Sequence, residues 1–295
     1  MPSADEHLGP AKVWQGKDRR TSQERRNNGE NIDRRSGIDR RGGKFVRVRS
    51  AADQKENNPG YFRALDRHNV SVVIPTLNEA KNLPYVLPLI PPWVYELILV
   101  DGLSTDGTVK LARKLRPDIH IIIEKKPGKG AALRSGFAAA KGDIIVMFDA
   151  DGSHDPAEIP LFVGALLAGA DFAKGSRFIK GGGSDDLEWY RRLGNWCLKM
   201  IVTLNFGGNY SDLCYGYNAF QARSLPKLNL DADGFDIETQ INIRALKENL
   251  KIREVPSFEA ERRHGESYLK TIPDGWLVLK TILKERYRRN REGAV

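Results

Sequence analysis

Asp149 and Asp151 are the residues whose type and spacing point most directly to chemistry. They flank one alanine after an apolar run, an arrangement that can direct two carboxylates toward one hard cation. Mg²⁺ or Mn²⁺ bound in this way keeps positions open for phosphate oxygens and neutralises the charge that grows on a departing diphosphate. Taken alone, Asp-x-Asp is more often part of a turn, so the motif needs support from its surroundings.

Polar residues also follow two earlier apolar runs. Residues 75–79 (PTLNE) follow the first run and Asp101 follows the second. A carboxylate at Asp101 can accept the ring N–H of uracil or guanine, and Thr76 and Glu79 are available to the nucleoside. The alternative is a local cap role before the next helix, which fits Asp106 well and Asp101 less well.

Lys129 lies between two glycines in residues 126–130 (KPGKG), just before a helix-compatible stretch over 131–140. Glycines and a lysine at a helix start allow a phosphate to approach closely. The spacing differs from Gly-x-x-x-x-Gly-Lys-Ser/Thr, so the sequence does not support an ordinary NTPase.

The elements that must position these residues are four apolar runs, over 70–74, 97–100, 119–123 and 143–148. Helix-compatible segments separate them, and strands alternating with helices predict a mainly parallel sheet built from βαβ units. Ligands of such sheets bind outside the carboxyl ends of the strands. The polar segments should therefore converge on one crevice.

The order and spacing of these motifs resemble glycosyltransferase family 2. The matching segments are 73–79 (VIPTLNE), 100–102 (VDG), 106–108 (DGT), 128–130 (GKG) and 149–151 (DAD). Later segments are similar to its dolichol-phosphate mannosyltransferase, or polyprenyl-phosphate glycosyltransferase, branch: 175–178 (GSRF), 191–195 (RRLGN), 212–217 (DLCYGY) and 263–267 (RHGES). The resemblance covers roughly residues 70–269. It implies a GT-A fold, a Rossmann-like α/β nucleotide-diphospho-sugar transferase fold whose mainly parallel sheet is flanked by helices.

The resemblance also implies roles for individual residues. The nucleotide-sugar would contact Pro75, Thr76, Glu79, Asp101, Lys129 and Asp149. The metal would be held by Asp149 and Asp151, and the acceptor phosphate by Arg177, Arg191, Arg263 and Ser267, with Asp151, Arg177 and Arg191 as the catalytic set. The chain departs from the branch at Ser153, where Gln is usual, and at Gly102, where a second Asp is usual. These departures put one metal ligand and the mode of base binding in doubt.

The arginines after the metal motif suit a phosphate acceptor, because guanidinium groups can grip phosphate through two hydrogen bonds. Without the resemblance, surface salt bridges would be the plainer interpretation of these arginines. A polyprenyl phosphate already carries an anionic oxygen, so its attack would need positioning and leaving-group stabilisation more than a base. One displacement inverts the anomeric configuration. A hydroxyl acceptor would require a base, for which Asp236 and Glu238 are the candidates and Asp212 is a weaker one.

Charge and apolar patterning bear on location. The 295-residue chain carries a formal net charge of +9, which favours anionic partners, and residues 1–67 are basic and arginine-rich, which predicts a disordered tail. Apolar stripes over 193–204 and 276–287 predict helices that either lie on an anionic bilayer or pack on the core. With two cysteines and no apolar signal or spanning segment, we expect a cytoplasmic, peripheral protein, recruited by the membrane surface or by a separate membrane subunit.

The sequence thus predicts a basic tail over 1–67, a GT-A domain over 68–270 and a basic amphipathic helix over 271–295. The expected activity is metal-dependent, inverting transfer of a hexose from a GDP- or UDP-sugar to a polyprenyl phosphate. Two alternatives stay open: a family 2 transferase with a hydroxyl acceptor, and a non-catalytic basic binding protein. Nucleic acid is the weaker candidate partner, and the sugar is not specified.

Overall fold

The computed structural model describes residues 32–33, 38–39, 67–268 and 271–288. The chain forms two compact units, Met1–Asn57 and Asn58–Val295. In the first, β1 (Ile32–Asp33) and β2 (Ile38–Asp39) pair antiparallel. The rest of the predicted tail lies outside the described residues, so its disorder stays a prediction.

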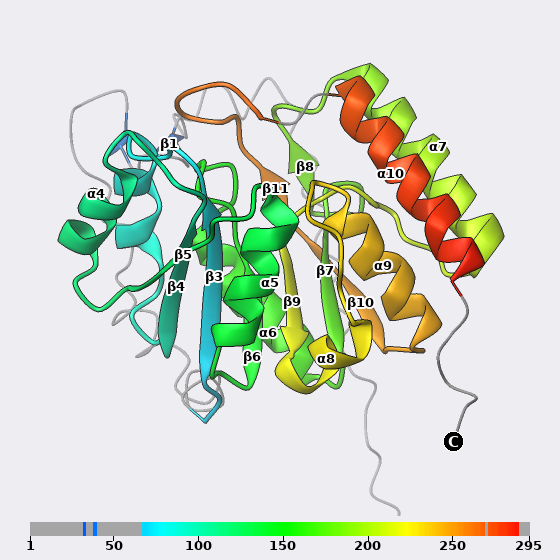
Figure 1. Cartoon of the computed structure of the whole chain (residues 1–295), viewed down its shortest axis with the longest axis horizontal. Coiled ribbons are helices and arrows are strands. Elements are labelled where there is room, and N and C mark those ends of the chain that lie inside the picture. Colours follow the sequence, from blue (N-terminus) through cyan, green and yellow to red (C-terminus); the bar gives the residue numbers. More distant parts are fainter. Residues whose placement is uncertain (1–31, 34–37, 40–66, 269–270, 289–295) are drawn as a thin grey trace, which may run out of the picture. The chain divides into compact units, whose positions relative to one another are not determined.

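A seven-stranded sheet forms the centre of the second unit, in the order β10-β7-β9-β6-β3-β4-β5 (Figure 1). The strands are β3 (Val70–Thr76), β4 (Glu96–Asp101), β5 (His120–Ile123), β6 (Ile144–Met147), β7 (Phe172–Ser176), β9 (Asn218–Gln221) and β10 (Ile252–Pro256). β9 is antiparallel to β6 and β7, and all other neighbours are parallel. The four predicted runs are therefore strands β3 to β6, and the mainly parallel sheet is confirmed.

Helices cover both faces of the sheet, which is why its strands are apolar on both sides. Val72 and Ile74 pack in one core cluster with α6 (Ile159–Leu167), whereas Val73 packs in another with α5 (Lys129–Ala139) and α9 (Ile237–Lys247). This difference arises because successive residues of a strand point to opposite faces. The helices and short 3₁₀ turns around the sheet are η1 (Leu83–Tyr85), η2 (Leu87–Leu89), α4 (Thr108–Leu115), α5 (Lys129–Ala139), η3 (Pro156–Glu158), α6 (Ile159–Leu167), η4 (Ala222–Ser224), α8 (Leu225–Leu228) and α9 (Ile237–Lys247).

Two longer helices, α7 (Trp189–Phe206) and α10 (Thr271–Tyr287), lie side by side next to α9 (Figure 1). A third core cluster joins them, with Val202 of α7 and Val278 and Ile282 of α10 among its buried members. A short parallel ladder between β8 (Gly183–Ser184) and β11 (Phe258–Glu259) lies outside the main sheet. No helix in the described ranges is long and apolar enough to cross a bilayer.

The two predicted apolar stripes lie largely at the surface. Leu204 of α7 is 78% exposed and Tyr287 of α10 is 81% exposed, whereas α10 packs inward through other residues, including Ile282. We call eight of the exposed apolar residues of the two helices the outer apolar face: Trp189, Leu193, Trp196, Met200 and Leu204 of α7, and Trp276, Leu283 and Tyr287 of α10. Of the two predicted alternatives, packing on the core does not apply to these side chains.

Candidate active site

A cavity of about 480 Å³ opens at the carboxyl ends of the central strands and extends to α7 and α10. Its strand-end wall includes Thr76, Asp149 and Arg177, which follow or end β3, β6 and β7. Its helical wall includes Gly194 of α7 and Gly275 of α10, and a Cβ added at either glycine would meet no atom within 4 Å. The crevice predicted at the strand ends therefore exists and has a second wall of helices.

The Asp-x-Asp carboxylates both line this cavity, but their surroundings differ. The Lys129 ammonium lies 2.8 Å from Asp149 Oδ1 and 2.9 Å from Asp149 Oδ2, and it also donates to Glu238 Oε1 at 2.9 Å. Asp151 Oδ1 instead accepts the Ser153 N–H at 3.0 Å and its hydroxyl at 2.7 Å. Ser153 thus orients Asp151 within a tight turn.

Burial acts on the pKa of both carboxyl groups beside Lys129, with different outcomes. Burial raises the pKa of Asp149, but the charge and hydrogen bond of Lys129, helped by Arg262, outweigh it, so the pKa lies below its ordinary value. For Glu238 burial prevails over Lys129, and the pKa lies above its ordinary value. Burial also lowers the pKa of Lys129, yet the two carboxylates more than offset this and raise it. Lys129 is therefore a permanent cation in the cavity wall.

His154 supports the backbone of the Asp149–Asp151 motif, a role that was not predicted from the sequence. Its Nδ1 accepts the backbone N–H of Asp149 at 3.1 Å, and its ring stacks on Tyr217 with centroids 4.6 Å apart. Burial lowers the pKa of His154, so the ring is neutral at pH 7 and carries its hydrogen on Nε2, 3.7 Å from Asp149 Oδ2. A neutral imidazole thus fixes the peptide that presents Asp149.

Glu79 is buried in the cavity wall and pairs with Arg262. Arg262 Nη2 donates to Glu79 Oε1 at 2.7 Å, and Asn82 Nδ2 donates to Glu79 Oε2 at 2.5 Å. Burial raises the pKa of Glu79 against these two partners. Arg262 Nε also lies 3.6 Å from Asp151 Oδ2. The loop after β11 therefore connects the predicted nucleoside side with the predicted metal side.

Asp101 and Asp106 differ in their hydrogen bonds. Asp106 Oδ1 accepts the Thr108 N–H at 3.0 Å, a local hydrogen bond just before α4, whose N-cap is Gly107. Asp101 Oδ2 accepts the Ser104 N–H at 2.9 Å, but its buried Oδ1 has no hydrogen-bond partner among the described residues. That oxygen can accept a ring N–H from a nucleobase. Thr76 and Pro75 line the cavity nearby.

Arg177 and Arg191 both line the cavity, and only Arg177 is fully held by neighbouring carboxylates. Arg177 binds Asp212 through Nε at 2.7 Å and Nη2 at 3.0 Å, and its Nη1 donates to Glu259 at 3.0 Å. Arg191, in the first turn of α7, lies 3.7 Å from Asp186, and its buried Nε has no hydrogen-bond partner among the described residues. Arg191 is therefore the guanidinium with capacity for an additional anion.

Three predicted site residues, Asp101, Arg263 and Asp236, are absent from the part of the cavity lining that the structure describes. Ser267 and Glu238 do line the cavity. The Arg263 guanidinium lies 4.8 Å above the Tyr85 ring, so Arg262 is the member of the pair that reaches the cavity. Asp236 accepts the Thr281 hydroxyl of α10 at 2.6 Å.

The donor set at the end of β6 fits Mg²⁺ or Mn²⁺. Asp149 and Asp151 supply hard oxygen ligands, and no group of three or more His, Cys, Asp or Glu side chains suited to a metal occurs within residues 67–268 and 271–288. Mg²⁺ commonly takes one or two carboxylates and completes its shell with water and phosphate oxygens. The carboxylate pair therefore suits a metal shared with a diphosphate better than a closed structural site.

Known proteins are similar to this chain in fold and in sequence. The solved structure of glucosyl-3-phosphoglycerate synthase from Mycobacterium tuberculosis, in complex with Mg²⁺ and uridine diphosphate, is similar with a TM-score of 0.64 and 25% identity, over 79% of this chain and 84% of that chain. Its GT-A fold is the fold observed here.

Two relatives match in sequence. Polyprenol monophosphomannose synthase of Mycolicibacterium smegmatis is 35% identical over 210 residues, 66% of this chain and 79% of that protein. Undecaprenyl-phosphate mannosyltransferase of Micrococcus luteus is 33% identical over 210 residues, 67% of this chain and 86% of that protein. Residues 71–228 match the family described as glycosyl transferase family 2, which is more than half of the chain. The chain therefore belongs to glycosyl transferase family 2.

Proposed function

We propose that this chain is a metal-dependent, inverting transferase that moves a hexose from a GDP- or UDP-sugar to a polyprenyl phosphate at the cytoplasmic face of a membrane. The observation that carries the proposal is the cavity that Asp149, Asp151 and Arg191 all line, in which the buried Nε of Arg191 has no hydrogen-bond partner among the described residues. The names of the two mannosyl-transferring relatives support the same acceptor class.

On the donor side, Asp149 and Asp151 would hold the metal and Glu79, Thr76 and Asp101 the nucleoside. Asp101 Oδ1, a buried acceptor with no hydrogen-bond partner among the described residues, supports this assignment. Bound Mg²⁺ or Mn²⁺ supplies charge neutralisation on the leaving diphosphate. His154 and Ser153 hold the two carboxylates in place before the donor arrives, which lowers the reorganisation that the reaction requires.

On the acceptor side, Arg191 would bind the phosphate, beside Arg177 and Ser267 in the cavity wall. An anionic phosphate oxygen forms the new bond to the anomeric carbon, while the bond from that carbon to the diphosphate breaks and its electron pair leaves with the nucleoside diphosphate. No proton needs to be removed, so the protein contributes orientation and charge. A single displacement inverts the anomeric centre.

The outer apolar face supports a peripheral position on an anionic membrane. Its aromatic residues Trp189, Trp196 and Trp276 are exposed on α7 and α10, and the exposed Lys280 and Lys284 accompany them on α10. Aromatic and aliphatic side chains flanked by cations suit the boundary between headgroups and acyl chains. A separate membrane subunit is the other means of recruitment that these helices would serve.

The test is transfer of label from a panel of GDP- and UDP-sugars into a lipid-extractable product, with Mn²⁺ or Mg²⁺ and added polyprenyl phosphate. We expect label in lipid with the wild type and its loss in both Asp151→Ala and Arg191→Ala. Arg223→Ala, at a side chain that is 76% exposed, is the matched control and should retain transfer.

Each other outcome points to a different activity. Metal-dependent donor binding or hydrolysis without labelled lipid would remove the phosphate acceptor and favour a hydroxyl acceptor, with Glu238 as the base in the cavity. Absence of nucleotide binding under all conditions would remove the enzymatic proposal and leave a basic binding protein.

A further inference from the structure

We propose that Lys129 and the divalent metal compete for Asp149, so that the metal binds tightly only together with a nucleoside diphosphate whose oxygens receive the displaced ammonium group. In this proposal the Lys129 ammonium group moves from Asp149 to the diphosphate oxygens. The inference rests on the proposed metal-dependent use of a nucleotide-sugar. It adds an order of binding to that proposal.

The contact itself is the first support. Lys129 Nζ is within hydrogen-bonding distance of both oxygens of Asp149, at 2.8 and 2.9 Å. A metal bound to either oxygen would therefore lie within a few ångströms of a buried ammonium, where repulsion between like charges is strong. A diphosphate offsets this repulsion because its oxygens can accept both cations at once.

The backbone of Lys129 cannot move aside, so the exchange must be made by its side chain. The Gly130 N–H donates to Asp233 O at 2.8 Å, which anchors the first turn of α5 on the loop before α9. A Cβ at Gly128 would lie 2.1 Å from Asp233 O, and one at Gly130 would lie 2.4 Å from Ala232 O. The segment that carries Lys129 is therefore packed directly against the loop before α9.

Glu238 keeps the displaced ammonium in the cavity. Its carboxylate lies 2.9 Å from Lys129 Nζ, and its side chain is only 7% exposed at the start of α9. A Cβ at Gly216 would lie 3.0 Å from Lys129 Nζ and 3.1 Å from Asp149 Oδ2, so Gly216 closes the remaining side at close range. Lys129 can leave Asp149 toward the open cavity while it still faces one carboxylate.

Mn²⁺ binding to the full chain, followed by electron paramagnetic resonance of the free ion, tests the inference without an activity assay. Lys129→Met removes the competing charge and should tighten Mn²⁺ binding without nucleotide at least tenfold. With Mn²⁺ present, the same variant should bind GDP or UDP at least tenfold more weakly. Lys110→Met removes an exposed lysine of α4 and should change neither value.

A second variant guards against misfolding of the first. Glu238→Gln leaves Asp149 as the sole carboxylate beside Lys129, so nucleotide-free Mn²⁺ binding should weaken, the opposite direction to Lys129→Met. Unchanged or weaker Mn²⁺ binding by a folded Lys129→Met would overturn the competition, as would tighter binding by Glu238→Gln. If the wild type binds no GDP or UDP with Mn²⁺, the proposed function fails instead.

Discussion

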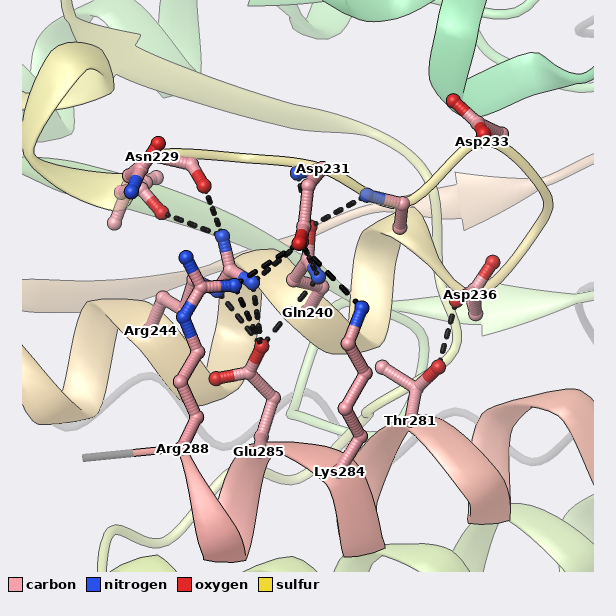
Figure 2. Close-up of polar contacts among 12 residues, drawn as sticks. Asn229, Asp231, Asp233, Asp236, Gln240, Arg244, Thr281, Lys284, Glu285 and Arg288 are labelled. Atoms are coloured by element: carbon pink, nitrogen blue, oxygen red, sulfur yellow. Dashed lines mark hydrogen bonds and ion pairs between the residues drawn. The ribbon is translucent and has the colours of Figure 1, made fainter. Parts of the chain in front are cut away.

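Helix α9 carries a buried charge cluster near each of its ends, and the two clusters differ in one respect. Near its start, Glu238 and Asp149 share Lys129 at the edge of the cavity. Further along, Arg244 binds Glu285 of α10 through Nε at 2.9 Å and Nη2 at 2.5 Å (Figure 2). We call the first the cavity cluster and the second the α10 lock.

The α10 lock is saturated by protein groups. Arg244 Nη2 also donates to Asp231 at 2.6 Å, Lys247 lies 3.2 Å from the second Glu285 oxygen, and the Glu285 side chain is 0% exposed. In the cavity cluster the Asp149 side chain is 20% exposed and Lys129 is 14% exposed. Burial and ion pairing are common to both, so access from the cavity is what makes a charged group available to a ligand.

The largest expected effect separates activity from stability. Asp149→Asn removes the charge that would hold the metal, and we expect transfer to fall by about three orders of magnitude, the scale of several kcal/mol of lost transition-state stabilisation. The melting temperature should stay close to wild type because Glu238 still pairs with Lys129. Steady-state kcat/KM and thermal melts measure the two effects, and a decrease of less than tenfold would contradict the assignment.

A change in the α10 lock should instead affect stability and leave the cavity intact. Glu285→Ala leaves Arg244 as a buried cation without its main partner, which costs about 3–5 kcal/mol of unfolding free energy. Urea unfolding measures the loss, and nucleotide affinity should change less than twofold. The double variant Glu285→Leu with Arg244→Met should recover much of the stability, because apolar replacement of both partners removes the stranded charge. Failure to recover would argue against this cause.

Acidification should weaken the α10 lock through Glu285. Burial raises the pKa of Glu285, but Arg244 and then Lys247 outweigh it, so the folded pKa lies below its ordinary value. Its stabilisation is complete above that ordinary value and is lost as pH falls through the lower folded pKa. Glu238, with a raised pKa, has the opposite sign. Melting temperatures from pH 6 to pH 3 should fall more steeply in the wild type than in Glu285→Gln.

The smallest expected effect distinguishes two neighbouring carboxylates. Asp236 accepts a hydrogen bond from Thr281 of α10, so Asp236→Asn should cost about 1 kcal/mol or less. Transfer should be unchanged, because Asp236 is outside the described cavity lining. A large loss of transfer in Asp236→Asn, with normal melting, would revive Asp236 as a base.

Local sequence patterns predicted the parallel strands and their polar ends, because strand periodicity and the motifs after each strand are properties of neighbouring residues. Contacts between distant segments were not predictable in this way. The pairing of Lys129 with Glu238 depends on how α9 returns to the strand ends. Arg262 rather than Arg263 lines the cavity, and two adjacent arginines in a sequence do not reveal which of them points inward. The antiparallel β9 likewise follows from long-range insertion between β6 and β7.

The two glycines in the helical wall offer a way to redesign the protein. Because Gly194 and Gly275 face open space on α7 and α10, each can accept a methyl group without displacing a neighbouring atom. Replacing one or both glycines with alanine would narrow the cavity in steps and would also favour the helical backbone. For the proposed polyprenyl acceptor, such substitutions offer a way to change chain-length selectivity while Asp149, Asp151 and Arg191 stay in place.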